Sequence, residues 1–580
     1  GNAMLKRSRS LIAAVVLLFS ASASADWIED SDKNSMIVLR AQAAFQPESV
    51  AAAGLNDFDG EIIDLGANYV DRREASDREL VVELERRLAD ESHPKIRQDL
   101  DILIQSLTDG IEARRAYHER LLPYINVHRL LFSSFKSLLD PRNDRERYAS
   151  ALDRLRKYTG SEPGYTAITE LARTRTAERL DVPGLLGPYQ GEVDKDLSDA
   201  PRFVTGMRSL FDRAQLTGWE DEFAKLEAQL VDYASWIEQE MLPRARPDNQ
   251  LPAELYAINL KNFGVRATPD ELIEQAQYGY QFIRSEMKSL AVRIADERGW
   301  EDKELVSVMR RLKAEQIPQD DLLAVYKNRL AEIEDIIRRE DIITLPERDA
   351  AIRMATEAES AAIPAPFMSP PQLINNTGQF GEFVLVQSNP AMGEDAVMDD
   401  WSHDAITWAL TVHEARPGHE LQFASLVENG TSLARARFAF NSANVEGWGL
   451  YAESIMHEYL PLEAQLFNLF TRQMRAARMF MDPMINTGQL TPEEAVDFMV
   501  NQIALSLPMA TSEAERYSFR MPGQATAYYY GYMNLMRLRT EVELKMGDRF
   551  NQREFHDFIL EQGLLPPEIL REAVADRFLN

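Results

Sequence analysis

The 580-residue sequence contains no cysteine. This absence excludes disulfide bonds, thiolate nucleophiles and metal sites with cysteine ligands. It also excludes a lipid anchor attached to a cysteine at a signal-peptide cleavage site. A metal site in this chain would therefore have to use histidine and carboxylate side chains.

Long apolar runs and positive charge are also scarce. Beyond residue 25, no segment has the roughly 18 uninterrupted apolar residues that indicate a membrane-spanning helix. The 64 Lys and Arg residues are outnumbered by 93 Asp and Glu, which gives a net charge of −29. A field this acidic does not favour nucleic acid or an anionic membrane. We therefore expect no nucleic-acid partner and no membrane anchor in the mature chain.

The N-terminus has the order of a secretory signal peptide. Residues 1–3 precede Met4 and are interpreted as a remnant of an expression tag. A basic patch, an apolar run over residues 11–19 and the small residues 23–25 follow in turn. This order predicts a signal peptide over residues 4–25. We expect an exported protein, with the bacterial periplasm as first choice and secretion as the alternative.

The rest of the chain has a helical pattern. It is 45% hydrophobic and 27% charged, which is ordinary for a globular protein. Apolar residues recur three and four positions apart over residues 80–88, 102–122 and 223–241, which predicts amphipathic helices. Thr268 and Thr491 each precede a proline and two acidic residues, a pattern typical of helix N-termini.

One stretch departs from the helical pattern. Between residues 363 and 399, periodicity stops and Pro, Gly and Asn accumulate. Within it, residues 381–387 read GEFVLVQ, a β-rich run that predicts a strand. An exposed strand edge beside a catalytic site could pair with an extended peptide. A hairpin that only covers the core is an equally open alternative.

Residues 413–419 read HEARPGH. On a regular helix, residues six apart are rotated by roughly 120° and lie about 9 Å apart along the axis, so His413 and His419 could not bind one metal. Pro417 removes the N–H that would bond the His413 carbonyl, and Gly418 permits unusual dihedral angles. We expect a helix that begins near residues 399–400 to break at this pair. A wide turn could then return His419 to His413.

A third ligand has to come from elsewhere. Residues 444–454 read NVEGWGLYAES and place Glu446 and Glu453 on nearly the same helical face. They lie about 10 Å apart, so only one can bind the metal. The glycines around Trp448 leave space for a ligand or another backbone and favour Glu446, while Glu453 could accept the N–H of a ligating histidine.

Two histidines and one glutamate, with a fourth position for water, form a catalytic zinc arrangement. Glu414 would then be the general base. A second His-Glu pair at residues 457–458 has no partner histidine downstream. Spacing alone therefore leaves a chance helix end as an open alternative.

Three motifs also carry a family resemblance: HEARPGHELQ, VEGWGLYAE and PGQATAYYYGYMNLMRLR, in that order. They resemble the bacterial family catalogued as domain of unknown function 885, which is similar to the thermolysin-like, gluzincin zinc peptidases. The resemblance covers about residues 45–575. It implies a mainly α, large zincin-like helical fold with a small β-sheet beside the active-site cleft.

The resemblance implies zinc as cofactor, with His413, His419 and Glu446 as ligands and Glu414 as base. One position departs from the family pattern: Glu420 stands where the family usually has another histidine. If that histidine were a ligand, this chain would have lost it. If it lies behind the ligands, Glu420 can still orient or neutralise a neighbour.

Candidate substrate residues lie near the C-terminal motif. The resemblance favours Tyr528 as a hydrogen-bond donor to the developing oxyanion. Arg539, on the same predicted helical face, could hold a substrate carboxylate, or it could pair with Glu543 four residues on. Arg416 could contact substrate or pair with Glu420.

We divide the mature chain into an N-terminal helical half, residues 26–360, and a catalytic half, residues 361–580, with a cleft between them. The expected function is zinc-dependent hydrolysis of short peptides. The alternatives are a non-catalytic, exported peptide-binding protein on the same fold and a zinc amidohydrolase with a non-peptide substrate.

Overall fold

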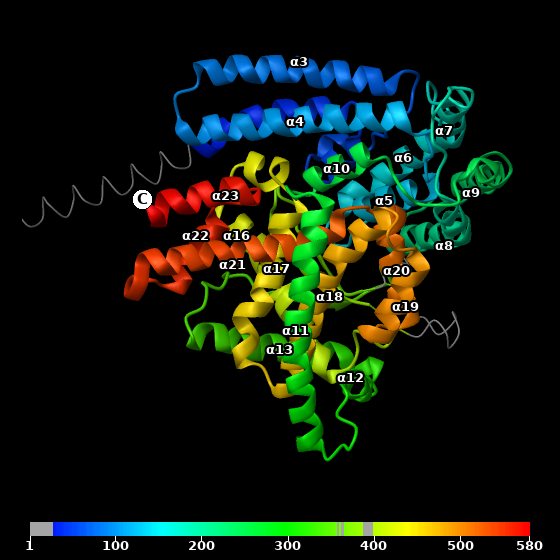
Figure 1. Ribbon diagram of the computed structural model, residues 1–580. Coiled ribbons are helices and arrows are strands. Elements are labelled where there is room, and N and C mark those ends of the chain that lie inside the picture. Colours follow the sequence, from blue (N-terminus) through cyan, green and yellow to red (C-terminus); the bar gives the residue numbers. More distant parts are fainter. Residues whose placement is uncertain (1–26, 357–358, 361–362, 364, 387–397) are drawn as a thin grey trace, which may run out of the picture.

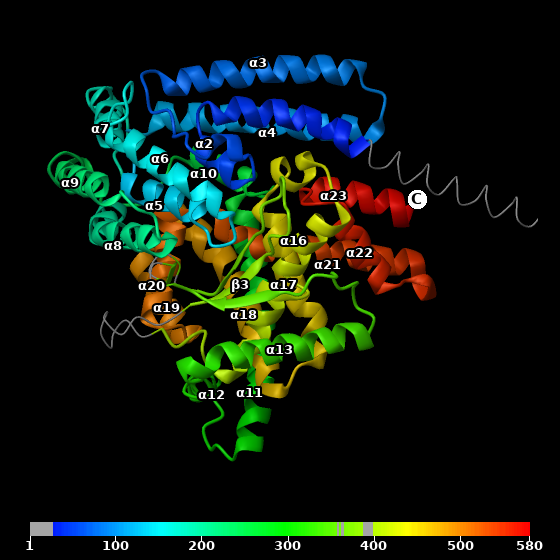
Figure 2. The same cartoon turned by 180° about the vertical axis from the view of Figure 1, so that it is seen from behind.

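The computed structural model describes residues 27–356, 359–360, 363, 365–386 and 398–580. The expected signal peptide lies outside the described residues. As predicted, the fold is mainly α-helical with one small sheet in the part described (Figures 1 and 2). Among the helices described, none combines the length and apolar character that crossing a membrane requires.

The N-terminal region is helical throughout. Residues 27–43 form its first described helix. The following helices are α2 (Pro47–Ala52), α3 (Tyr69–Asp90), α4 (Pro94–Arg120), α5 (Val127–Leu138), α6 (Ser150–Thr159), α7 (Ile168–Ala177), α8 (Gln190–Ala214) and α9 (Glu220–Trp236). Helices α3 and α4 run side by side along one edge of the molecule (Figure 1). Helices α5 to α9 enclose a core of their own, which includes Phe135, Phe211 and Phe223.

The remaining helices follow residue 252. They are α10 (Ala253–Asn262), α11 (Pro269–Arg298), α12 (Leu305–Lys313), α13 (Gln319–Arg339), α15 (Thr407–Leu410), α16 (His419–Asn429), α17 (Ser442–Met456), α18 (Leu462–Asn486), α19 (Pro492–Gln502), α20 (Leu507–Glu515), α21 (Ala527–Met546), α22 (Gln552–Glu561) and α23 (Pro567–Val574). Helix α18 is buried on nearly all sides and packs against α11, α15 and α21.

The hydrophobic cores do not separate the chain into two halves. One core joins Val38 and Leu100 to Trp448 and Phe555. The core around α5 to α9 ends at Ala245, and a second large core begins at Tyr256. Helices α10 to α13 belong to this second core because they bury their apolar faces against α18 and its neighbours.

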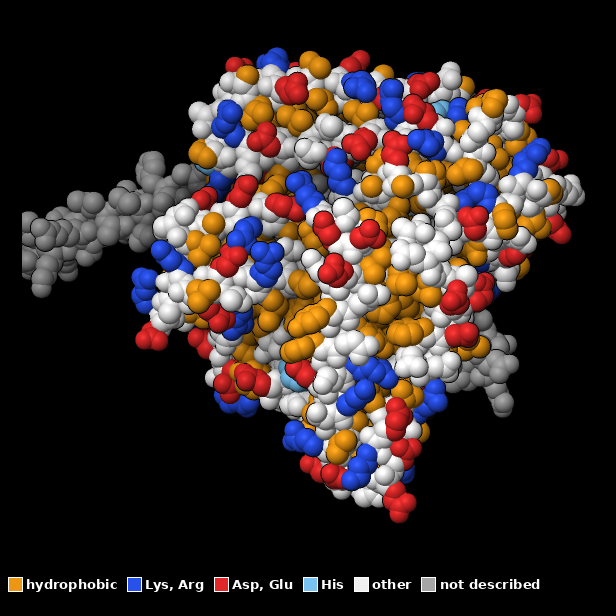
Figure 3. Space-filling model, in the orientation of Figure 1, with side chains coloured by type: hydrophobic (Ala, Val, Ile, Leu, Met, Phe, Trp, Pro, Cys, Tyr) orange, Lys and Arg blue, Asp and Glu red, His pale blue; other side chains and the backbone are white. Residues whose placement is uncertain are grey.

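On the face shown in Figure 3, acidic and basic side chains intermingle over the surface.

Both predicted helix caps are present. The Thr268 hydroxyl accepts the Glu271 N–H at 3.2 Å. Thr491 and Glu494 form a reciprocal capping box, with bonds of 3.1 and 3.2 Å. Each threonine thus satisfies an N–H that a helix start leaves unpaired.

The sheet contains β1 (Ala351–Met354), β2 (Phe367–Ser369) and β3 (Glu382–Leu385) in the order β1–β3–β2. Strand β3 falls within the predicted strand at residues 381–387. It pairs in parallel with β1 and antiparallel with β2. The interpretation of this strand as a free edge for a peptide is therefore wrong, because both of its sides already carry a partner. Strand β2 lies against the segment that carries the histidine motif.

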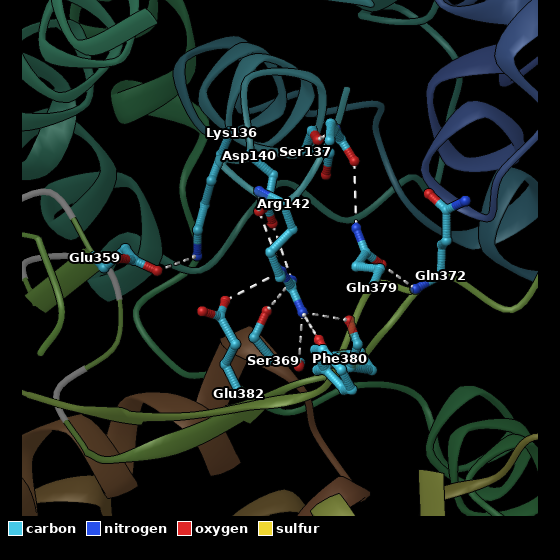
Figure 4. Close-up of polar contacts among 12 residues, drawn as sticks. Lys136, Ser137, Asp140, Arg142, Glu359, Ser369, Gln372, Gln379, Phe380 and Glu382 are labelled. Atoms are coloured by element: carbon cyan, nitrogen blue, oxygen red, sulfur yellow. Dashed lines mark hydrogen bonds and ion pairs between the residues drawn. The ribbon is translucent and has the colours of Figure 1, made fainter. Parts of the chain in front are cut away.

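Arg142, just after α5, ties the N-terminal core to this sheet (Figure 4). Its guanidinium donates to the main-chain oxygens of Ser369, Pro370 and Phe380 at 3.2, 3.2 and 2.7 Å. It also pairs with Glu382 of β3 at 3.1 Å. The planar, multi-donor guanidinium is suited to joining several acceptors at once. The N-terminal half therefore helps to position the sheet that borders the candidate site.

Candidate metal centre

The helix that carries the motif begins later than expected. A 3-10 turn, η7 (Asp404–Ile406), leads into α15 and then into a π-helical turn, η8 (Thr411–Ala415). The expected start at residues 399–400 is a loop instead. The buried Asp400 carboxylate there accepts hydrogen bonds from Lys313 at 2.9 Å and from the Ser506 N–H at 3.0 Å. These distant partners hold the segment out of the helix.

The break at Pro417-Gly418 occurs where the sequence predicts it. Arg416 is extended, the Arg416–Pro417 peptide is cis, and α16 begins at His419. The Gly418 N–H bonds the Val412 carbonyl at 2.9 Å. A Cβ on Gly418 would lie 2.0 Å from the His413 carbonyl oxygen, so only glycine fits. The turn returns His419 to His413, with ring centroids 4.7 Å apart.

Glu446 of α17 meets both imidazoles. Its Oε1 lies 3.2 Å from His413 Nε2 and 2.9 Å from His419 Nε2. Among the described residues, these three side chains form a group able to hold a metal, with donor atoms within 4.8 Å of one another. In a tetrahedral zinc site with bonds of about 2.0–2.1 Å, neighbouring donors lie ~3.3 Å apart. Two nitrogens and one oxygen at these separations fit zinc.

Two glycines allow α17 to approach closely on two sides. A Cβ on Gly449 would lie 2.7 Å from both Cε1 and Nε2 of His413 and 3.0 Å from Cε1 of His419. A Cβ on Gly447 would lie 2.7 Å from Cα of Gly531 in α21. One glycine therefore makes room for the imidazoles, and the other makes room for a neighbouring helix.

Glu453 lies behind His413. Its Oε2 is 2.6 Å from His413 Nδ1. Its other oxygen accepts the Thr471 hydroxyl, and its main-chain oxygen accepts the Asn468 amide at 2.9 Å. A carboxylate at Nδ1 places the imidazole proton there and leaves Nε2 directed at the donor group. Glu446 and Glu453 thus occupy the two different positions that the sequence suggests.

The histidine and glutamate side chains of the site shift one another's pKa values. Burial lowers the pKa of His413, but hydrogen bonds to Glu446 and Glu453 outweigh it and raise the pKa to about 9. Burial opposes ionisation of Glu446, yet the two imidazoles hold its pKa well below the usual value. A proton and a cation would therefore compete for the same atoms. Partial burial raises the pKa of the Glu414 carboxyl, which lies beside the group.

Arg416 and Glu420 pair with each other. Arg416 Nε donates to Glu420 Oε2 at 2.7 Å, and both side chains are buried. A second carboxylate, Glu334 of α13, lies 3.5 Å from Arg416 Nη1. Of the two sequence interpretations, the structure supports pairing rather than substrate contact. Glu420 accordingly holds the motif loop and is not among the converging donors.

Tyr528 and Arg539 differ in their surroundings. Tyr528 is buried, and its hydroxyl accepts hydrogen bonds from Arg516 and Gln524, both at 3.4 Å. Arg539 pairs with Glu543 at 2.6 Å and donates to the Tyr451 hydroxyl at 3.0 Å. The alternative interpretation of Arg539, a pair on its own helix, is the one observed. We therefore do not assign Arg539 to substrate.

The sequence interpretation missed the α18 residues behind the site. Asn468 and Thr471 hold Glu453, and Arg475 donates to the Thr471 main-chain oxygen at 3.2 Å. A usable signal was present: arginine recurs every third residue over residues 472–478, within a helix rich in apolar residues.

A cavity of about 260 Å³ lies between α17, α21 and α23, and its lining includes Trp448, Asn534 and Arg571. None of its lining residues belongs to the converging donors. It is therefore separate from the candidate metal centre.

Known proteins resemble this chain over nearly its whole length. The family model described as "Bacterial protein of unknown function (DUF885)" matches residues 47–574. The crystal structure of a candidate lipoprotein from Colwellia psychrerythraea aligns with a TM-score of 0.74 at 17% identity, covering 95% of this chain and 99% of that one. A candidate lipoprotein of unknown function from Shewanella oneidensis aligns at 0.70 and 18%, covering 93% and 98%. These likenesses show a shared fold. No curated protein matches the chain.

Proposed function

The chain belongs to the bacterial DUF885 family, whose function is unknown, and from its own site we propose that it is an exported zinc-dependent peptidase acting on short peptides. The observation that carries the proposal is the convergence of His413, His419 and Glu446, with Glu414 adjacent to the group but not in it. In this arrangement the three converging side chains would be the metal ligands, and Glu414 would be the base. A zinc ion bound there would lower the pKa of its water to about 7 and polarise the scissile carbonyl.

The chain's own residues would transfer the proton, orient the ligand and stabilise the oxyanion. Glu414 takes a proton from the attacking water and passes it to the leaving amine. Its position suits this exchange, because it directly follows the proposed ligand His413 and its side chain is partly exposed. Glu453 keeps His413 oriented through the 2.6 Å contact at Nδ1. Tyr528 is the candidate donor to the developing oxyanion.

A non-catalytic peptide-binding protein is the weaker alternative. Such a protein has no need of a carboxylate base beside a ligating histidine. A zinc amidohydrolase with a non-peptide substrate would use the same residues, so the choice of substrate decides between the two enzymes.

The test combines metal analysis of the purified protein with hydrolysis of a mixed peptide library. We expect about one equivalent of zinc and cleavage of short peptides. Glu414→Gln should keep its metal and lose at least about a hundredfold in peptide hydrolysis, the low end for removal of a general base. Glu458→Gln, an exposed position in the second His-Glu pair, is the matched control.

Three results would contradict the proposal or part of it. Equal loss of metal and activity in Glu414→Gln would make Glu414 a ligand. Full activity in that variant would remove it from the mechanism. Zinc binding without hydrolysis of any library peptide would exclude the peptidase.

Export has a separate test. Expression of the chain from Met4 in a bacterium should yield a periplasmic protein whose N-terminus begins at Asp26, after cleavage at Ala25. A full-length cytoplasmic product would contradict export without affecting the proposed chemistry.

A further inference from the structure

Three buried arginines face the C-terminal motif. Arg472, Arg475 and Arg478 of α18 are each nine-tenths or more buried. The Arg472 guanidinium lies 5.5 Å from the ring centre of Tyr532. Those of Arg475 and Arg478 lie 5.7 and 4.6 Å from the ring centre of Tyr528. Because the two tyrosines are four residues apart on α21, the arginines and tyrosines line one helix–helix interface.

The three arginines at this interface differ in their ion-pair partners. Arg478 makes two 2.7 Å bonds to Glu513. Within the described ranges, by contrast, no ion pair joins Arg472 or Arg475 to a carboxylate. Nε and Nη2 of Arg472 and Nε of Arg475 are buried without hydrogen-bond partners. Arg478 also has one unpaired nitrogen, and other arginines such as Arg154 have an unpaired Nε, but Arg472 has two. Unpaired buried guanidinium donors are costly, and a ligand with acceptor oxygens here would satisfy them.

The interface lies directly behind the metal centre. Arg475 donates to the Thr471 main-chain oxygen at 3.2 Å, and the Thr471 hydroxyl holds Glu453. Arg475 is also close enough to stabilise the charge of Glu414. Near Tyr528, the Gln524 carbonyl oxygen is a further buried polar atom without a partner. A ligand at this interface would therefore adjoin the proposed base.

Neutralising the carboxylates of the metal centre can explain the presence of Arg475 but not that of Arg472. Arg475 can offset one of the carboxylates beside His413. Among the described residues Arg472 has no such carboxylate, and its neighbours include the Tyr532 ring and His457, whose pKa burial and Arg472 lower to about 4. Internal balance therefore leaves the guanidinium group of Arg472 unexplained.

We propose that Arg472 and Arg475 bind a carboxylate of the substrate. This inference rests on the proposed peptidase function and deepens it by naming the substrate class, peptides with a carboxylate close to the bond that is cleaved. A guanidinium presents a fork of donors that matches the two oxygens of a carboxylate.

The test uses one peptide sequence in three forms: a free C-terminal acid, a C-terminal amide, and an amide with glutamate as its last residue. For the zinc-loaded protein, kcat/KM should be at least about tenfold higher for a carboxylate form than for the plain amide, since one charge-assisted hydrogen bond is worth about that factor. The first and third forms distinguish a main-chain from a side-chain carboxylate.

Arg472→Gln and Arg475→Gln should reduce the ratio of kcat/KM for the carboxylate form to kcat/KM for the plain amide towards one. Arg475→Lys, which keeps the charge but loses the fork, should retain part of it. Arg537→Gln, an exposed arginine on α21, is the matched control and should keep the full preference. Affinities of the same peptides for Glu414→Gln, measured by calorimetry, should follow the same order and are independent of turnover.

Equal cleavage of acid and plain amide by the wild type would overturn the carboxylate site and leave the peptidase standing. A loss of equal size on both forms in Arg475→Gln, with a native circular dichroism spectrum, would also overturn it. If no peptide of any form is cleaved or bound, the proposed peptidase fails, and this inference fails with it.

Discussion

At residue scale, Gly449 is the position that the two imidazoles themselves constrain. Both imidazoles lie where its side chain would be, with 2.7 Å from its built Cβ to His413 Nε2. Gly449→Ala must move either α17 or the histidines. Because Glu446 comes from the same helix, a shift of either kind separates the three donors.

We therefore expect Gly449→Ala to fold and to bind zinc at least about tenfold more weakly, the low end for a disturbed ligand environment. Zinc titration by calorimetry measures this. Gly110→Ala in α4 is the control, because the built Cβ there meets only the flexible Arg114 side chain. Unchanged zinc affinity in Gly449→Ala would contradict the close approach of α17.

The two glutamates of α17 give a second prediction at this scale. Glu446→Ala should lose zinc under mild chelation, since it removes one of three donors. Glu453→Ala should only weaken binding by about 10–100-fold, because it acts through His413. The reverse order in zinc titration would exchange their roles.

Single residues were predictable where the motif itself defines the geometry. The proline and glycine of HEARPGH indicate the break, and the spacing of Glu446 and Glu453 indicates their separate positions. The roles of Arg416 and Arg539 were left open because their acceptors are chosen by packing. Arg416 meets Glu334 from α13, and Arg539 meets Tyr451 from α17. No local pattern identifies such partners.

At the scale of elements, the crossing of α17 and α21 is the tightest contact near the site. A Cβ on Gly531 would lie 2.0 Å from the main-chain oxygen of Ala443 and 2.9 Å from Cα of Gly447. Both neighbours are backbone atoms, so neither can rotate away. Any side chain here pushes the two helices apart.

Gly531→Ala should accordingly lower the free energy of unfolding by about 1–3 kcal/mol, the usual cost of overpacking a core. It should also weaken zinc binding, because α17 carries Glu446. Chemical denaturation and zinc titration of the same sample check both effects. Gly110→Ala should be as stable as the wild type or slightly more stable, because alanine favours a helix more than glycine does. A Gly531→Ala variant as stable as the wild type would show that the helices adjust freely.

Helices were easier to predict than their ends and the sheet. Periodicity over residues 80–88 and 102–122 depends only on local spacing, and α3 and α4 are present there. The start of the motif helix depends on Asp400 meeting Lys313, 87 residues away. The central place of β3 depends on strands at residues 351–354 and 367–369. Such distant pairings leave no local pattern.

At the scale of the whole molecule, α8 meets the C-terminal half through a charged contact. Asp196 pairs at 3.0 Å with Arg520, in the π-helical turn η11 (Arg516–Arg520). Burial, and then Asp196, raise the pKa of neighbouring Glu192 to about 7. In the unfolded chain this carboxyl returns to 4.5. Between these values the folded protein holds a proton that the unfolded chain releases.

Stability must therefore fall as the pH rises through this window, because the native state binds more protons than the unfolded state. Glu192→Gln removes that contribution. From pH 5 to pH 8, the variant should lose less free energy of unfolding than the wild type, by on the order of 1 kcal/mol after solvent screening. Urea denaturation at several pH values measures the difference. Glu238→Gln, at an exposed position, should follow the wild-type curve.

The way the two ends of the chain pack together was the least predictable feature at this scale. Composition changes near residue 360, where helical periodicity stops, but one core joins Val38 and Leu100 to Trp448 and Phe555 across that point. Helices α10 to α13 look like their N-terminal neighbours in sequence. Their core is decided by which other helix covers their apolar face.

The Arg142 junction has a consequence for how this family can diverge. At Pro370 and Phe380 the arginine bonds only main-chain oxygens, which every amino acid supplies. Substitutions at those two positions leave the acceptors in place, so they can accumulate without a compensating change at residue 142. In an alignment of relatives, we expect an invariant arginine opposite variable positions, with no covariation between them. A contact that matters to the architecture would thus be invisible to methods that infer contacts from paired substitutions.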